Sequence, residues 1–191
     1  MTGMTLRRGR GFSLLELMLV LALAMLVTGW ALPSLDDFLQ GVRVNTTVKH
    51  YLGMLESTRY RSMSEQRPAT ICATAADGIT CARDGGTGLV IFEDRDEDGV
   101  VDATEKVVLE ERLVDGGGYW LAWRSFQNRP YLRWALGRTD SMNGTYTLCN
   151  REGKDKLLRQ LVVNRTGRTR IVVPARSAAS VLQSARQACG W

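Results

Sequence analysis

A run of carboxylates between residues 94 and 105 has the residue types and the spacing of a calcium-binding loop. The stretch DRDEDGVVDATE matches the pattern D-x-D-x-D-G-x5-E. Asp94, Asp96 and Asp98 take positions 1, 3 and 5, and Glu105 takes position 12, where a carboxylate can chelate through both oxygens. Asp102 at position 9 can contribute through a bridging water molecule. The pattern predicts an all-oxygen site that suits calcium.

The segments that flank the acidic loop distinguish it from an EF-hand. GLVIFE before it and KVVLEERL after it are typical of β-strands, whereas an EF-hand has a helix on each side. The loop is therefore either an EF-like calcium loop within a β-hairpin, where the ion stiffens the turn, or an acidic turn that only faces solvent. We expect that the protein requires no cofactor, and calcium is the ion that this loop is suited to bind.

Arginines near the C-terminus have the spacing of a phosphate-binding motif. The stretch VVNRTGRTRIVVP contains Gly-Arg-x-Arg as Gly167, Arg168, Thr169 and Arg170. If the segment is extended, Arg168 and Arg170 lie on one face roughly 7 Å apart, and each guanidinium group can bind a phosphate. Arg165, Arg176 and Arg186 would extend the patch. The alternative is a solvated hairpin in which Gly167 supplies a positive φ angle.

The charged residues are unevenly distributed along the chain. Residues 93–115 contain ten acidic and three basic side chains, whereas residues 116–191 contain thirteen basic and three acidic ones. A basic final third favours an anionic partner such as DNA, bound largely without sequence preference. Aromatic residues between positions 119 and 134 permit base stacking, but alternation sends Tyr119, Leu121 and Trp123 to one face, which favours a core role.

Four cysteines, Cys72, Cys81, Cys149 and Cys189, all follow the apolar N-terminal segment. If that segment sends the rest of the chain across a membrane, the cysteines reach an oxidising space. Four cysteines allow three pairings, of which we favour Cys72 with Cys81 and Cys149 with Cys189. Zinc ligation is the rival interpretation, but the chain has no CxxC pair and its one histidine, His50, is distant in sequence.

An apolar segment near the N-terminus carries one ionisable side chain close to its start. Residues 17–35 contain no charged side chain, and this run is long enough to cross a bilayer as a helix. The arginines before it should stay in the cytoplasm. A cleaved signal peptide is the alternative. Glu16 in such a segment costs a few kcal/mol unless it is paired. Cleavage after Gly11 would create an amino terminus on Phe12 of a neighbouring subunit that can neutralise Glu16.

These residues must be positioned by one long helix and a set of strands. Apolar residues continue at steps of three and four, which predicts a helix from about Phe12 to about Glu65, kinked at Pro33. The apolar positions are Leu35, Phe38, Leu39, Val42, Val48, Tyr51, Leu52 and Leu55. Eight strands follow, in ATICATA, GLVIFED, KVVLEERL, YWLAWRS, YLRWAL, GTYTLCN, LRQLVVN and RTRIVV. The expected fold class is α+β, with the apolar stripe of the helix packed on an antiparallel β-sheet domain.

The string G-F-S-L-L-E-L-M resembles the class III signal of type IV prepilins, with Gly11, Phe12 and Glu16 at the matching positions. The strand content and the basic C-terminal hairpin resemble the GspH/FimT group of minor pilins and pseudopilins. The resemblance implies cleavage by a prepilin peptidase, N-methylation of Phe12, and a role for Glu16 in setting register during assembly. It implies a pilin-like fold. No serine, cysteine or acidic residue is arranged around His50 in a catalytic pattern, so we expect no enzymatic activity.

The resemblance also implies a domain organisation and a location. Residues 1–11 would be the leader, 12–35 the transmembrane and assembly half of the helix, 36–66 its amphipathic half, and 67–191 a periplasmic β-rich domain. The protein would be a single-pass inner-membrane protein that joins other pilins or pseudopilins in a pilus or pseudopilus. FimT-like members carry a C-terminal Gly-Arg-x-Arg motif that contacts DNA in natural transformation. A type II secretion pseudopilin without DNA binding is the alternative.

Overall fold

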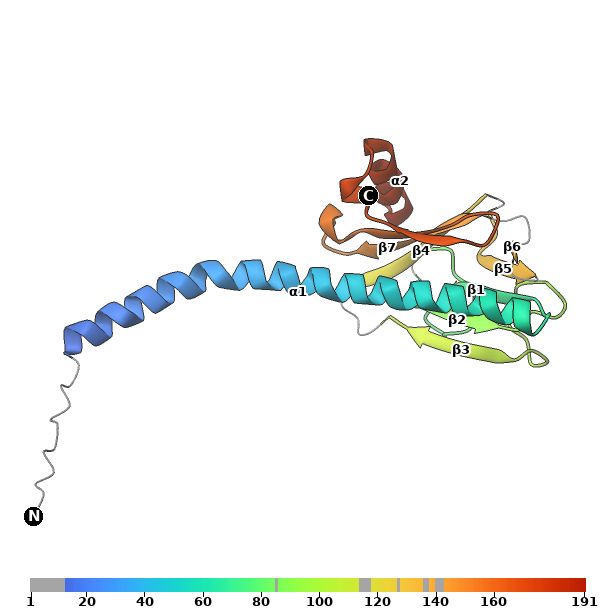
Figure 1. The fold of residues 1–191 in the computed structure, drawn as a ribbon, viewed down its shortest axis with the longest axis horizontal. Coiled ribbons are helices and arrows are strands. Elements are labelled where there is room, and N and C mark those ends of the chain that lie inside the picture. Colours follow the sequence, from blue (N-terminus) through green and yellow to red (C-terminus); the bar gives the residue numbers. More distant parts are fainter. Residues whose placement is uncertain (1–12, 85, 114–117, 127, 136–137, 140–142) are drawn as a thin grey trace, which may run out of the picture. The chain divides into compact units, whose positions relative to one another are not determined.

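The computed structural model describes residues 13–84, 86–113, 118–126, 128–135, 138–139 and 143–191, and the side chains at 27–34 and 138–139 lie outside that description. The chain divides into two compact units, Met1–Gln40 and Gly41–Trp191. Helix α1 (Leu14–Ser64) begins in the first and ends in the second (Figure 1). The predicted long helix is therefore confirmed. Pro33 falls within α1, but its side chain is among those not described, so the kink expected there stays a prediction.

Antiparallel strands in two sheets make up most of the second unit. The first sheet has the order β3-β2-β1-β5-β6, and the second has the order β4-β7-β8-β9. The strands are β1 (Ala69–Thr74), β2 (Gly88–Phe92), β3 (Val107–Arg112), β4 (Tyr119–Ser125), β5 (Tyr131–Ala135), β6 (Arg138–Thr139), β7 (Gly144–Asn150), β8 (Arg159–Val163) and β9 (Thr169–Val172). All eight predicted strands are present, and β6 is an additional short one. The α+β fold is thus confirmed, with two sheets where one was expected.

The C-terminal part of α1 supplies one wall of the hydrophobic core. Val44, Val48, Tyr51, Met54 and Leu55 are buried at spacings of three, four and one residues, which places them on one side of the helix. They belong to the same core cluster as inward-facing side chains of both sheets. Fully burying a valine, leucine or methionine side chain contributes roughly 1.5–3 kcal/mol relative to leaving it exposed.

The apolar stripe of α1 enters the core later in the sequence than expected. Val48, Tyr51 and Leu55 are buried and Leu52 packs against the core, as predicted. Four upstream positions included in the predicted stripe are instead 44% to 65% exposed. They are Leu35, Phe38, Leu39 and Val42. The apolar spacing continues through these positions, but the first side chain of α1 in the core is Val44. Periodicity alone therefore overestimated how much of the helix packs against the core.

A row of side chains across the second sheet faces the core. Register aligns Trp123, Tyr146, Leu161 and Ile171 on β4, β7, β8 and β9. The rings of Trp123 and Tyr146 lie 4.2 Å apart between centroids, and the Tyr146 hydroxyl donates to the carbonyl of Ile71 in the first sheet at 3.1 Å. Burial raises the pKa of the Tyr146 hydroxyl, which keeps it a neutral donor. This hydrogen bond joins the two sheets inside the core.

Aromatic residues of β4 have the core role that their alternation favours. Leu121 and Trp123 are buried, and Tyr119 packs against the same cluster. The indole nitrogen of Trp123 donates to the carbonyl of Arg129 at 2.7 Å. Base stacking on Trp123 would require its removal from this packing.

A helix at the C-terminus was not predicted. Helix α2 (Ala179–Cys189) packs Ala185, Ala188 and Cys189 against a second, smaller cluster that contains Ala122 and Cys149. It ends at Gly190, whose φ of 84° is the left-handed conformation common after helices. Two 3-10 turns, η1 (Asp155–Leu157) and η2 (Pro174–Arg176), precede it.

Candidate functional site

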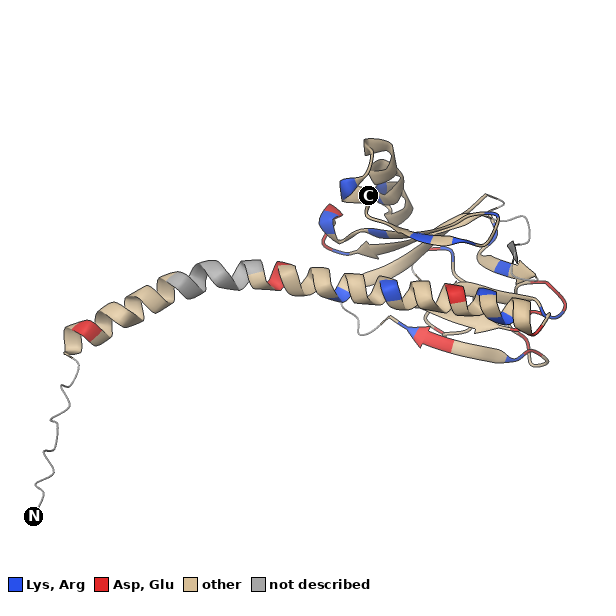
Figure 2. Cartoon of the chain, in the orientation of Figure 1, with Lys and Arg blue, Asp and Glu red and all other residues tan. Residues whose placement is uncertain are grey.

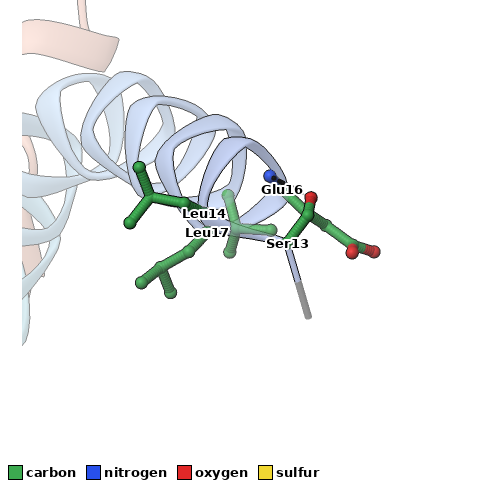
Figure 3. A pocket seen from close by; sticks show the side chains of 5 residues that line it. Ser13, Leu14, Glu16 and Leu17 are labelled. Atoms are coloured by element: carbon green, nitrogen blue, oxygen red, sulfur yellow. Dashed lines mark hydrogen bonds between the residues drawn. The ribbon is translucent and has the colours of Figure 1, made fainter. Parts of the chain in front are cut away.

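The start of α1 presents apolar side chains and one carboxylate to its surroundings. The Ser13 hydroxyl accepts the backbone N–H of Glu16 at 3.2 Å, as an N-terminal capping residue does. Ser13, Leu14, Glu16 and Leu17 line a pocket together with Val20, and Figure 3 shows the Glu16 carboxylate directed away from Leu14 and Leu17. The predicted processing residues Gly11 and Phe12 lie outside the described part of the chain.

The first unit has little apolar burial of its own. Every large apolar side chain described between residues 14 and 26 is at least half exposed. They are Leu14, Leu15, Leu17, Met18, Leu19, Val20, Leu21, Leu23, Met25 and Leu26. Within the described residues, none of the helices combines the length and the apolar character needed to span a bilayer.

The hairpin between β8 and β9 holds the predicted arginine motif on a well-defined turn. Oδ1 of Asn164 accepts the backbone N–H groups of Thr166 and Arg168 at 3.1 and 2.9 Å. The N–H of Gly167 donates to the Asn164 carbonyl at 2.9 Å, and the φ of Gly167 is 77°. Glycine therefore serves the turn at this position, as the structural interpretation of the motif expected. The same turn fixes the backbone from which Arg168 projects.

Arg170 lies on the face of the second sheet that points away from the core. Register places it in a row with Val162, Thr145 and Arg124, adjacent to the row that faces the core. Arg168 and Arg170 are both exposed. Among the described residues, neither guanidinium group has a hydrogen bond or an ion pair. The structure therefore leaves both charges open to a ligand.

Several other basic residues of the final third are already engaged, which reduces the charge available to a partner. Arg124 pairs with Asp84 at 2.6 Å, Arg133 with Glu97 at 3.3 Å, and Arg186 with Asp155. Figure 2 shows the basic residues along the C-terminal hairpin and the acidic ones at the loop that follows β2.

The two remaining arginines of the predicted patch differ in their surroundings. Arg165 is exposed in the turn and makes contacts of its own. Arg176 is exposed in η2 and lies near Arg159. Burial lowers the pKa of Arg159, and the positive charge of Arg176 lowers it further. Arg159 donates to Oδ1 of Asn45 at 2.9 Å and to the carbonyls of Lys156 and Leu158 at 2.8 Å each. Arg176 is therefore beside a second, buried cation.

The acidic loop connects β2 to β3, so the predicted hairpin setting is confirmed. One carboxylate oxygen from each of Asp94, Asp96 and Asp98 lies within 4.8 Å of the others. Asp102 accepts the backbone N–H and the hydroxyl of Thr104 at 2.6 and 2.7 Å, and these hydrogen bonds lower its pKa. Burial raises the pKa of Glu105, whose Oε1 accepts the backbone N–H of residue 95 at 2.8 Å.

Both favoured disulfides are present. Cys72 of β1 bonds Cys81, and Cys149 of β7 bonds Cys189 at the end of α2. The pairing predicted from spacing is confirmed, and the chain has no free cysteine. The second bond fixes α2 to the outer face of the second sheet.

Comparisons with known proteins agree with this architecture. The family model described as type II transport protein GspH matches residues 48–167, and the prokaryotic N-terminal methylation motif matches residues 6–32. The first match ends at Gly167, before Arg168 and Arg170, and the second contains Gly11, Phe12 and Glu16. A search of curated proteins gave no significant match.

Solved structures of a minor pseudopilin and of a type IV minor pilin are similar to this chain. The minor pseudopilin EpsH from the type 2 secretion system of Vibrio cholerae aligns with a TM-score of 0.50 and 10% identity, over 70% of this chain and 99% of that one. The type IV minor pilin FimU of Pseudomonas aeruginosa aligns with a TM-score of 0.49 and 18% identity, over 71% of this chain and 92% of that one. The EpsH alignment supports the fold, and the family match covers more than half of the sequence. The chain belongs to the GspH family of type II transport proteins and has the fold of a pilin-like minor subunit.

Proposed function

We propose that this protein is made as a prepilin, cut after Gly11 by a prepilin peptidase, and methylated on Phe12. Residues 12–35 then hold it in the inner membrane with its disulfide-bonded body in the periplasm, and assembly with other pilins extracts it into a filament. The match to the N-terminal methylation motif over residues 6–32 supports the processing step. The uncharged run from residue 17 to residue 35 supports the membrane step.

The observation that carries the proposal is the exposed apolar start of α1 with a single carboxylate in it. Ten described apolar side chains from Leu14 to Leu26 are half exposed or more, a surface that water disfavours and that lipid or neighbouring helices would cover. Glu16 is exposed in this surface, where covering it without a partner costs several kcal/mol. The amino group of Phe12 on an adjacent subunit is the partner that satisfies it.

The test compares Glu16→Ala with Glu65→Ala, which removes an exposed carboxylate at the other end of α1. We expect Glu16→Ala to fractionate with membranes like the wild type but to be lost from sheared filaments. Glu65→Ala should behave as the wild type in both assays, because its exposed side chain pairs, among the described residues, with Arg61 one helical turn away, and surface pairs of this kind contribute little. Incorporation of Glu16→Ala at wild-type levels would remove the proposed role of the charge.

DNA capture is a second function that we propose for the same subunit, through Arg168 and Arg170. The support is geometric: both side chains are exposed on the β8–β9 hairpin, without hydrogen-bonding partners among the described residues, and Arg165 lies in the same turn. Two guanidinium groups held by one hairpin can neutralise two phosphates and release their counterions. Binding is then largely independent of sequence and falls steeply with salt.

A double variant tests this mode of binding. Arg168→Gln/Arg170→Gln should weaken duplex binding, and the slope of log K against log salt should become shallower by about 2, because each phosphate that is no longer neutralised accounts for about 0.9 of the slope. Arg61→Gln/Arg112→Gln removes the same net charge from arginines that pair with carboxylates elsewhere, so its slope should stay at the wild-type value. Equal slopes for the two double variants would refute specific use of the hairpin.

A pseudopilin of a type II secretion system remains the alternative proposal, since one of the similar solved structures is a minor pseudopilin of such a system and another is a type IV minor pilin. The two roles predict different losses in a deletion strain. A pilus subunit should be needed for piliation, and for transformation if DNA capture is its task. A pseudopilin should be needed for secretion of exoproteins, with piliation unchanged.

A further inference from the structure

The loop between β2 and β3 contains a buried carboxylate of which one oxygen has a hydrogen-bond partner among the described residues and the other has none. Asp94 is 0% exposed. Its Oδ2 accepts the hydroxyl of Thr70 at 2.6 Å and lies 4.0 Å from Nη1 of Arg133. Its Oδ1 is also buried and has no hydrogen-bond partner among the described residues. An unpaired buried oxygen on a carboxylate has lost its hydration without gaining a hydrogen bond, which is unfavourable.

The other end of the loop repeats this pattern. Oε1 of Glu105 accepts a backbone N–H at 2.8 Å, whereas its Oε2 is buried without a hydrogen-bond partner among the described residues. The N–H that Oε1 accepts belongs to Arg95, the residue after Asp94, so the two ends of the loop lie side by side. The two ends of the twelve-residue loop therefore each place one unpaired carboxylate oxygen in the same region.

Nearby cations do not balance the remaining carboxylates. Nη1 of Arg133 lies 4.0 Å from Oδ2 of Asp94, and its Nη2 pairs with Glu97 at 3.3 Å. Arg95 projects to Glu93, 3.7 Å away. Asp96 and Asp98 keep their ligand oxygens within 4.8 Å of that of Asp94, and the ion pairs of the described residues include neither of them. Like charges held this close favour a bound cation.

We infer that this loop is a calcium site in which Asp94, Asp96, Asp98 and Glu105 supply carboxylate oxygens. Two ligands of one Ca²⁺ lie at most about 5 Å apart, twice the metal–oxygen distance, and the three aspartates already meet this limit. Mg²⁺ requires shorter distances and near-octahedral geometry. Asp102 is occupied by Thr104 and is not required as a direct ligand.

Bound calcium would connect the loop to three strands that are distant in sequence. Asp94 contacts Thr70 of β1 and Arg133 of β5, and Glu105 leads directly into β3. An ion that binds both ends of the loop thus couples these strands at one end of the first sheet. This inference does not rest on filament assembly or on DNA binding, because it concerns contacts within one chain.

Calcium binding by the purified full-length chain in detergent micelles tests the inference. After removal of metal with EDTA, equilibrium dialysis against calcium chloride should show one ion per chain, with a Kd of about 10⁻⁴ to 10⁻³ M. Calcium chloride at about ten times that Kd should raise the Tm, and magnesium chloride at the same concentration should raise it less.

Two variants locate the ion, and a third controls for charge. Asp98→Asn removes an exposed ligand and Glu105→Gln a half-buried one, so both should fold, as circular dichroism would verify. Each should raise the calcium Kd at least tenfold. Glu110→Gln makes the same charge change on the surface of β3 and should leave the Kd unchanged. The inference is overturned if dialysis detects no calcium, if magnesium stabilises equally, or if the two loop variants bind calcium like the wild type.

Discussion

The two disulfides should differ in how much they stabilise the fold, because they close loops of very different length. Cys72 and Cys81 are separated by 9 positions, whereas Cys149 and Cys189 are separated by 40. The longer loop contains β8, β9 and α2. The perturbation is the removal of one bond at a time, in Cys72→Ala/Cys81→Ala and in Cys149→Ala/Cys189→Ala.

The expected magnitudes follow from the entropy that each bond removes from the unfolded chain. For loops of these lengths the chain-entropy relation gives about 2.6 kcal/mol for the short loop and about 4 kcal/mol for the long one at 25 °C. Cys72 and Cys149 are fully buried and their partners are largely buried, so the packing lost in the two double variants is similar. The variant without Cys149–Cys189 should therefore be the less stable, by about 1.3 kcal/mol.

Urea unfolding of the two variants beside the wild type measures this order. Both should shift the midpoint to lower urea, and the variant without Cys149–Cys189 should shift further. Hydrogen exchange gives an independent readout, since only that variant should lose protection across α2, which is then held by packing and by the Arg186–Asp155 pair. Equal midpoints, or a larger shift for the variant without Cys72–Cys81, would contradict the loop-length argument.

Two further substitutions test the packing of α1 and the turn of the acidic loop. Leu55→Ala should lower the free energy of unfolding by about 2–5 kcal/mol, because the side chain is 0% exposed, whereas Leu39→Ala on the same helix is 44% exposed and should change it by less than about 0.5 kcal/mol in urea titrations. Gly99→Ala should lower the Tm and reduce calcium retention, since the φ of Gly99 is 76° and a Cβ there would lie 2.0 Å from Cε1 of Tyr131. A Gly99→Ala variant with wild-type Tm would show that the loop relaxes freely.

Sequence patterns predicted the long helix and the strands because each has a strong local signal. Strands such as β2 (Gly88–Phe92) and β8 (Arg159–Val163) are short apolar runs bounded by turn residues, and the structure confirms them. Helix α2 also had a signal, since Val181, Leu182, Ala185, Ala188 and Cys189 recur at helical spacing before a glycine. The signal is weak because several of these residues are small and only weakly apolar.

The arrangement of strands in two sheets depends on long-range pairing that local patterns do not encode. Alternation indicated that Leu121 and Trp123 share a face, but not that β4 pairs with β7 in a separate sheet. The sequence pattern of the acidic loop likewise does not distinguish a buried aspartate from an exposed one. In the fold, Asp94 is buried beside Thr70 and Arg133 because it follows β2 closely, whereas Asp96 and Asp98 are exposed.

Similar long-range contacts decide which arginines are available to a partner. The sequence suggests that Arg186 joins the basic patch, but it pairs with Asp155, 31 positions earlier. Arg159 is buried against carbonyl oxygens and the side chain of Asn45 on α1. Net charge therefore overstates the basic surface of the final third, and Arg168 and Arg170 remain exposed parts of it.

The bond between Cys149 and Cys189 makes the C-terminal part of the chain a covalent ring. The β8–β9 turn, with exposed Arg165 and Arg168, lies inside this ring and offers cleavage sites to trypsin-like proteases. A cut after either arginine opens the ring but releases no fragment, because the two pieces stay joined through the disulfide. The two pieces of such a cleaved molecule would separate only after the disulfide is reduced. A single cut in this exposed turn therefore detaches no part of the protein.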